Sequence, residues 1–136
     1  MNNYKGFTEL DCYKNGRELR KSISILAKKF PKEERYELVS QMKRSSRSIT
    51  ANIAEGYGRY TYTDTRHFFI ISRGSLTETM EHLTTAFDEE YISEDELKNE
   101  WKKCELVFKL INGFIGYLDK SKKEQRAKPQ IPNYNL

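Results

Sequence analysis

Apolar residues recur every three or four positions in four successive stretches of the chain, a spacing that places them on one face of an α-helix. We therefore expect helices near residues 8–30, 32–57, 64–89 and 94–121, and no β-strand. In the first stretch the repeating positions are Tyr13, Gly16, Leu19, Ile23, Leu26 and Phe30. The short links between the stretches favour an all-α, antiparallel up-down-up-down four-helix bundle.

Residues typical of helix ends stand between these stretches. Thr8 is expected to cap the first helix, and Pro31 separates the first helix from the second. Ser93 and Glu96 have the spacing of a capping box at the start of the fourth helix. Two further borders are expected at Gly56 or Gly58, as a left-handed cap of the second helix, and at Thr63 or Asp64, as the N-cap of the third.

The second helix combines a small apolar stripe with a polar one. Leu38, Met42, Ser46, Ile49 and Ile53 form the apolar stripe, and Ser45, Ser48, Asn52, Glu55 and Arg59 lie beside it. The antiparallel arrangement of helices two and three then places Ser48 near Ser75, and Ser45 near Glu78. We expect Arg44 or Arg47 to pair with Glu78, and loss of that pair to cost about 3 kcal/mol if it is buried.

Helices three and four carry the remaining apolar positions. Phe68, Ile71, Ser75, Leu83 and Phe87 repeat along the third, and Leu97, Trp101, Cys104, Phe108, Ile111, Ile115 and Leu118 form the expected core face of the fourth. Val107, Leu110, Phe114 and Tyr117 widen that face beyond the need of one bundle. Because large exposed apolar patches are uncommon on monomers, a second subunit is expected to cover them.

Length and composition agree with one bundle. At 136 residues the chain can bury a core without disulfides. We expect the bundle domain to span residues 1–122, and residues 123–136 to form a charged, proline-containing tail. The chain shows neither an apolar run long enough for a membrane span nor the pattern of a secretory signal, so a cytoplasmic location is the default expectation.

Residue patterns for catalysis and metal binding are weak. His67 and His82 are separated by about 22 Å along one helix, too far to share a metal ion. Cys12 and Cys104 lack the spacing of a metal or disulfide motif. The glycines of EGYGR follow a helix, whereas a phosphate-binding loop precedes one. We therefore expect no catalytic residue, metal or cofactor.

The charge is distributed unevenly. Residues 1–62 hold 13 Lys and Arg against 7 Asp and Glu, a balance of +6, and residues 63–118 hold 6 against 11, a balance of −5. Candidate phosphate contacts are Lys43, Arg47, Arg66, Arg73, Lys120, Lys122, Lys123, Arg126 and Lys128. Two other interpretations stay open. The cations can be solvated or paired within the chain, or basic helices can meet acidic helices of a second subunit.

The segment from Phe30 to Glu78 resembles the rRNA intervening-sequence proteins, a family of small bacterial four-helix bundles. The similarity rests on a helix that ends in NIAEG followed by GR, and on a second motif in the third helix. The motif residues are Arg44, Ser48, Asn52, Glu55, Gly56, Gly58, Arg59, Gly74, Ser75 and Glu78. Ser45, Ser46 and Arg47 stand where family members commonly have alanine or another small residue.

The resemblance implies a fold and an assembly but no activity, because the family is named after the location of its reading frames inside rRNA genes. A related protein, the accessory variability protein of diversity-generating retroelements, is a pentamer of four-helix bundles that binds nucleic acid and a reverse transcriptase. By analogy, this chain is expected to form a homopentamer and to bind RNA or DNA, with a nucleic-acid-handling protein as a further partner. The alternative is a scaffold that assembles with protein alone.

Overall fold

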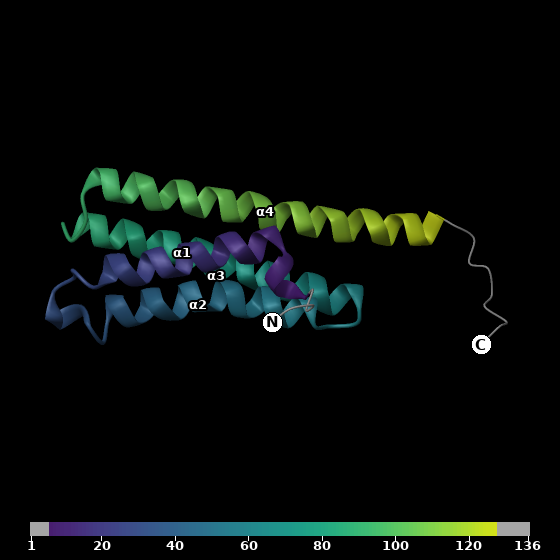
Figure 1. The fold of residues 1–136 in the computed structure, drawn as a ribbon, viewed down its shortest axis with the longest axis horizontal. Helices are drawn as coiled ribbons and strands as arrows, with labels where there is room; N and C mark the ends of the chain where they lie inside the picture. Colours follow the sequence, from purple (N-terminus) through teal and green to yellow (C-terminus); the bar gives the residue numbers. More distant parts are fainter. Residues whose placement is uncertain (1–5, 128–136) are drawn as a thin grey trace.

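The computed structural model describes residues 6–127 and confirms the all-α four-helix bundle (Figure 1). Within that range the elements are α1 (Asp11–Ala27), α2 (Leu38–Tyr57), α3 (Tyr62–Asp88) and α4 (Glu94–Ala127), with no strand. Two short 3-10 turns, η1 (Phe7–Glu9) and η2 (Lys32–Glu34), precede α1 and α2. Each helix packs against its neighbour in sequence, and α1 also packs against α4, which closes the bundle.

One hydrophobic core runs along the bundle. Each helix supplies residues spaced by three or four, so that the buried positions form a continuous stripe. The largest fully buried side chains include Leu19, Ile23, Met42, Ile49, Phe69, Leu76, Leu83 and Ile111. Small side chains lie among them, and Gly16 is one: a Cβ there would lie 3.2 Å from Cγ2 of Thr50. The backbones of α1 and α2 therefore approach closely at this point.

Three helices begin at residues other than those predicted. Thr8 lies inside η1 and does not cap α1. Glu37 leaves the helical region of backbone space, so α2 begins at Leu38, and the Glu34 carboxylate accepts a 3.4 Å hydrogen bond from the Leu38 amide. At α3, the cap is Thr61, whose hydroxyl accepts from the Asp64 amide at 3.1 Å. These starts depend on the local turns between the helices, which the spacing of apolar residues does not predict.

The left-handed cap occurs at a different helix from the one predicted. Gly58 ends α2 at φ −80°, and no glycine among the described residues has positive φ. Instead Glu90, after α3, has φ 64°. The amide of Tyr91 donates to the carbonyl of Ala86 at 2.9 Å, and that of Glu90 to Phe87 at 2.9 Å, which is the pattern of a Schellman motif. A glutamate thus occupies the position that usually holds glycine.

The predicted stripes of α3 and α4 are confirmed in part, because Ser75, Leu83, Cys104, Ile111 and Ile115 are buried, but other positions differ. On α4 the buried positions are Cys104, Val107, Ile111 and Ile115, whereas Phe108 is 37% exposed. On α3, Phe69 is buried and Ile71 is exposed. Both helices carry further apolar residues next to these stripes, so periodicity alone left the edges of the buried faces ambiguous.

The fourth helix is longer than predicted. It continues through Ala127, past the expected border at residue 122, and its C-terminal part extends beyond the end of the bundle (Figure 1). The rest of the expected tail, residues 128–136, lies outside the described residues. A basic helical segment therefore projects next to the link between α2 and α3.

Candidate nucleic-acid interface

Hydroxyl groups join α2 to α3 through the bundle. The oxygens of Ser48 and Ser75 lie 2.8 Å apart, as predicted, and Asn52 donates to the Ser48 hydroxyl at 2.8 Å. Ser45 lies 2.8 Å from Thr79, one residue along from the predicted neighbour Glu78. No buried side-chain polar atom of the described residues lacks a hydrogen-bond partner. These motif residues therefore specify how α2 packs against α3.

Arg44 and Glu78 form the predicted ion pair, and His82 Nε2 donates to the same carboxylate at 3.1 Å. The pair is not buried, because the side chains of Arg44 and Glu78 are 62% and 37% exposed. Desolvation raises the pKa of Glu78, but the hydrogen bonds from His82 and Arg44 outweigh it, and the pKa lies below its usual value. The expected cost of losing this pair therefore falls from about 3 to about 1 kcal/mol or less.

The glycines of the resemblance motif have different surroundings. A Cβ at Gly56 would lie 3.0 Å from both Phe68 Cβ and Phe69 Cδ1, so this position permits the close contact of α2 with α3. Gly58 is exposed, and Gly74 faces open space with no atom within 4 Å of an added Cβ. The fold of one chain explains the need for glycine at position 56 and does not explain it at 74.

Glu55 and Arg59 complete the motif at the end of α2. Glu55 finds its basic partner in the link before α3: Arg59 Nε lies 3.1 Å from the Glu55 carboxylate. The Arg59 guanidinium also stands 4.7 Å from the ring centroid of Phe68, a cation–π contact. Both side chains remain substantially exposed. Arg59 is thus held at the surface by two contacts within the chain.

A basic seam, which we define as Arg17, Arg20, Lys43 and Arg47, follows the line where α1 meets α2. Arg20 crosses the seam and donates to the Thr50 hydroxyl at 2.8 Å. Arg17 lies one turn from Arg20 on α1, whereas Arg47 and Lys43 lie one and two turns from Thr50 on α2. No described acidic side chain forms an ion pair with any of the four. From Leu38 to Ala54, α2 contains no Asp or Glu.

The other predicted cations differ in how far they are engaged within the chain. Arg66 donates to the carboxylate of Asp119 at 2.8 Å, and Arg73 donates to the Asn112 side chain at 2.7 Å. Lys122 lies 5.7 Å from the centroid of the Tyr62 ring. Lys120 and Lys123 are exposed; the Arg126 side chain and all of Lys128 lie outside the described residues. The structure therefore separates Arg66 and Arg73, which hold α3 to α4, from the exposed lysines.

A polar cluster that periodicity did not predict ties α1 to α4. Glu100 is only 4% exposed, and both its oxygens lie 2.7 Å from the Ser22 hydroxyl. Lys103 donates to Ser22 at 2.8 Å and lies 3.4 Å from the Glu100 carboxylate. The serine hydroxyl is thus held between a carboxylate and an ammonium group, and the charged pair satisfies the buried acid. The sequence held one signal of this cluster: Glu100 stands at a core-facing position of the fourth helix, three residues before Lys103.

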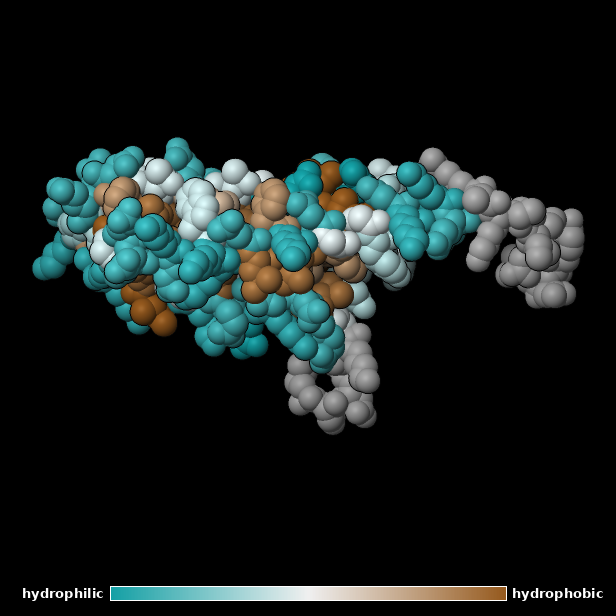
Figure 2. All heavy atoms as spheres, turned by 90° about the horizontal axis from the view of Figure 1, so that it is seen from above, coloured by the Kyte–Doolittle hydropathy of each residue, from teal (hydrophilic) through white to brown (hydrophobic). Residues whose placement is uncertain are grey.

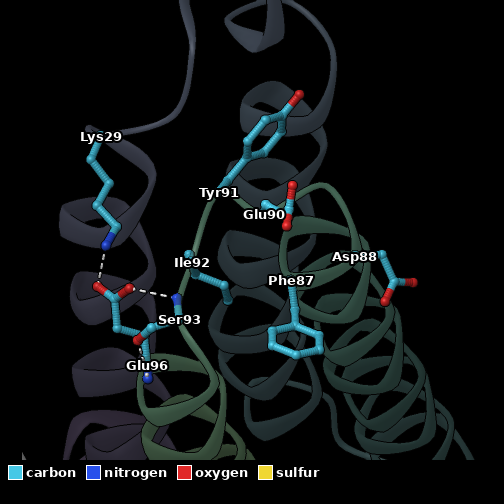
Figure 3. A pocket seen from close by; sticks show the side chains of 8 residues that line it. All are labelled: Lys29, Phe87, Asp88, Glu90, Tyr91, Ile92, Ser93 and Glu96. Carbon is cyan, nitrogen blue, oxygen red and sulfur yellow. Dashed lines mark hydrogen bonds and ion pairs between the residues drawn. The ribbon is translucent and has the colours of Figure 1, made fainter.

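A pocket of about 630 Å³ lies at the turn from α3 to α4 (Figure 3). Lys29 and the Ser93 amide both reach the carboxylate of Glu96, and the Glu96 amide donates to the Ser93 hydroxyl at 3.1 Å, which confirms the predicted capping box. Nearby, Tyr91 donates to Glu34 at 2.7 Å, a bond that raises the pKa of the phenol to about 12. These contacts close one end of the bundle.

Apolar surface gathers on the outward side of α4. Figure 2 looks down on this side and shows apolar patches in the middle of a largely polar face. Two adjoining hollows between α3 and α4, of about 640 and 310 Å³, share Trp101 and Glu105 in their walls. Met80 and Phe108 line the larger one. Of the four residues predicted to meet a second subunit, Val107 is instead buried in the core of its own bundle, and Leu110, Phe114 and Tyr117 line a different hollow beside the start of α1.

The described residues contain no group of three side chains arranged to hold a metal ion. Burial raises the pKa of the Cys12 thiol to about 11 and that of Cys104 to about 12, so both stay protonated near neutral pH. Over residues 6–127, no helix is both long and apolar enough to cross a membrane.

Comparison with known proteins assigns the chain to a family. The family model described as 23S rRNA-intervening sequence protein matches residues 8–113, which include the α2 motif and most of the bundle. The chain belongs to this family. A solved structure from Bacteroides thetaiotaomicron, described as a protein of unknown function from the S23 ribosomal protein family, has the same fold. It aligns with a TM-score of 0.72 at 24% identity, over 77% of this chain and 95% of that one. Comparison with curated proteins gives no match.

Proposed function

We propose that this member of the 23S rRNA-intervening sequence family is a non-enzymatic, cytoplasmic homo-oligomer that associates with RNA or DNA. The basic seam is the observation that carries this proposal. Arg17, Arg20, Lys43 and Arg47 lie on two packed helices and have no acidic partner among the described residues. Nucleic-acid backbones are the common biological polyanions that such a row of cations suits.

The rigidity of the seam favours phosphate binding over simple solvation. The Arg20 guanidinium is held by Thr50, and the Thr50 hydroxyl in turn donates to the Arg47 carbonyl at 3.2 Å. A cation that is already oriented loses less side-chain entropy when it binds a phosphate. The exposed Lys120 and Lys123 would add long-range attraction from the end of α4.

A binding titration at several salt concentrations tests the proposal. The probes are a fluorescein-labelled RNA hairpin and a DNA duplex, and the variant is Lys43→Ala/Arg47→Ala. We expect the variant to bind more weakly and its salt dependence to fall by about one unit of slope for each phosphate contact removed. Lys14→Ala/Lys28→Ala, which removes two exposed charges outside the seam and outside the hollows between α3 and α4, is the matched control. Equal binding by both variants would contradict the assignment of the seam.

The apolar side of α4 favours self-assembly, with or without nucleic acid. Phe108 is an exposed large apolar residue, and Trp101 lines both hollows, the larger of them together with Phe108. A second copy would remove this surface from water, with a gain of about 25 cal/mol for each Å² covered. The subunit number of five comes from the resemblance to the accessory variability protein.

A scaffold that assembles without nucleic-acid binding is the second candidate function. A nucleic-acid-handling protein is a further candidate partner.

Light scattering tests the assembly directly. The wild type is expected at five times the 16.1 kDa mass of the chain, and Phe108→Lys at a lower mass. Asn99→Lys, which introduces the same charge at an exposed position of α4, is the control and should leave the mass unchanged. A wild-type mass of one chain at micromolar concentration would contradict the oligomer and leave the nucleic-acid proposal to its own titration.

A further inference from the structure

We infer that the end of α2 and the link to α3 form a stacking site for the bases of single-stranded nucleic acid, with Tyr57 and Tyr60 as its platforms. This inference rests on the proposed function and specifies its ligand. Tyr60 is fully exposed and Tyr57 is 42% exposed, so neither ring is needed to fill the core. Two exposed rings within four residues offer flat apolar surface that a flipped-out base can cover.

An arginine stands between these two rings in the sequence. The Arg59 guanidinium lies over Phe68 and is paired with Glu55, and its side chain is 44% exposed. An arginine plane can itself stack on a base or bind the adjoining phosphate. The link thus combines the two elements of single-strand recognition, which are aromatic faces and a cation that contacts the backbone.

The projecting end of α4 adds further cations beside the first turn of α3, which follows the link. Asp119 accepts from both Tyr62, at 2.5 Å, and Arg66, at 2.8 Å, and so fastens this part of α4 to the first turn of α3. Lys122 lies against the ring of Tyr62, and Tyr62 follows Tyr60 by two positions in the sequence. Lys120 and Lys123, on the same turn of α4, are exposed. A strand whose bases stack on the link would therefore have lysines beside its phosphates.

A duplex cannot use this site in the same way, because its bases are stacked on one another and only its backbone and groove edges are accessible. The basic seam, by contrast, can bind the phosphates of either form. The two surfaces therefore make separable predictions. Loss of the rings weakens single-strand binding alone, and loss of the seam weakens both.

Fluorescence anisotropy with labelled oligothymidylate, oligouridylate and a DNA duplex tests the inference. Tyr57→Ala/Tyr60→Ala should lower the affinity for both single strands by about 10-fold for each ring, with the salt slope unchanged because no cation is removed. Duplex affinity should stay at the wild-type value. Tyr57→Phe/Tyr60→Phe keeps the rings and should bind like the wild type.

Tyr36 provides the matched control, since it is 85% exposed just before α2, at the other end of that helix from Tyr57, and Tyr36→Ala should bind like the wild type. Three results would overturn the inference: unchanged single-strand affinity in the double alanine variant, an equal loss on the duplex, or a changed oligomer mass in light scattering. If Lys43→Ala/Arg47→Ala still weakens duplex binding in the first case, the proposed function survives without the stacking site. Failure of the wild type to bind any probe would overturn both.

Discussion

The backbone of Gly56 on α2 lies so close to the ring of Phe69 on α3 that an added Cβ would stand 3.0 Å from Cδ1. Phe69 is fully buried and stacks on Phe114 of α4 with centroids 4.4 Å apart, so it has little room to move. We predict that Gly56→Ala lowers the free energy of unfolding by about 1 to 3 kcal/mol, because overpacking forces the helices apart.

Gly74→Ala is the control for this change, because an added Cβ at Gly74 meets no atom within 4 Å. Alanine at a helical position should raise the stability of the isolated bundle by up to about 1 kcal/mol. Urea unfolding of both variants measures the difference. Equal effects at the two glycines would show that the contact with Phe69 is not responsible.

Two glutamates that form ion pairs should differ in their effect on stability. Glu100 is buried between Ser22 and Lys103, and we expect Glu100→Ala to cost about 2 to 3 kcal/mol, since hydrogen bonds to a desolvated charge are lost. Glu78 is 37% exposed, and Glu78→Ala should cost about 1 kcal/mol or less. Urea midpoints of the two variants test the order; a larger loss at Glu78 would contradict it.

Glu90 offers a stabilising substitution. Its φ of 64° places the backbone in the left-handed region, which glycine adopts without the steric penalty that a Cβ brings. Glu90→Gly should raise the free energy of unfolding by about 0.5 to 1 kcal/mol, the relief of strain being partly offset by greater freedom of the unfolded chain. Glu89→Gly, at the preceding helix cap with φ −81°, is the comparison and should not stabilise. Thermal unfolding of both proteins decides between these outcomes.

Stability should fall at acid pH. The hydrogen bond from Lys29 lowers the pKa of Glu96, and the hydrogen bond from Arg66 lowers the pKa of Asp119. The pKa of Glu78 is also lowered, although desolvation acts in the opposite direction. A carboxyl whose pKa is lower in the folded state stabilises the fold when ionised. Its contribution is present above the unfolded value, 4.5 for glutamate, and is lost as the pH falls through the folded value.

The variant Glu78→Gln/Glu96→Gln/Asp119→Asn tests this dependence, because it removes the three charges and keeps groups that can accept hydrogen bonds. Its urea midpoint should change less between pH 5 and pH 3 than that of the wild type, the range in which these carboxyls titrate. The same acid-induced loss in both proteins would assign the effect to other carboxyls.

Much of the fold was predictable because its signals are local. The capping box of Ser93 and Glu96 lies within four residues, and the antiparallel register that brings Ser48 to Ser75 and Arg44 to Glu78 follows from one short link. The left-handed cap was predicted at the wrong place, because glycine composition pointed to Gly56 and Gly58. In the turn after α3, the backbone hydrogen bonds of Glu90 and Tyr91 to the last turn of the helix hold Glu90 in that conformation, and the residue types there do not predict it.

By itself, the sequence determined the number of helices, their antiparallel order and the pairing along α2 and α3, since helical periodicity and short links constrain neighbours in the chain. Periodicity also predicted the buried stripe of α2, at Leu38, Met42, Ser46, Ile49 and Ile53. The tertiary structure alone decided where the buried faces of α3 and α4 end. That packing buries Val107 and exposes Phe108, and it encloses Glu100 with Ser22, 78 positions away. It also pairs Arg66 with Asp119 and leaves Arg47 without an acidic partner among the described residues. Such contacts join residues far apart in sequence, and their geometry depends on how all four helices pack at once.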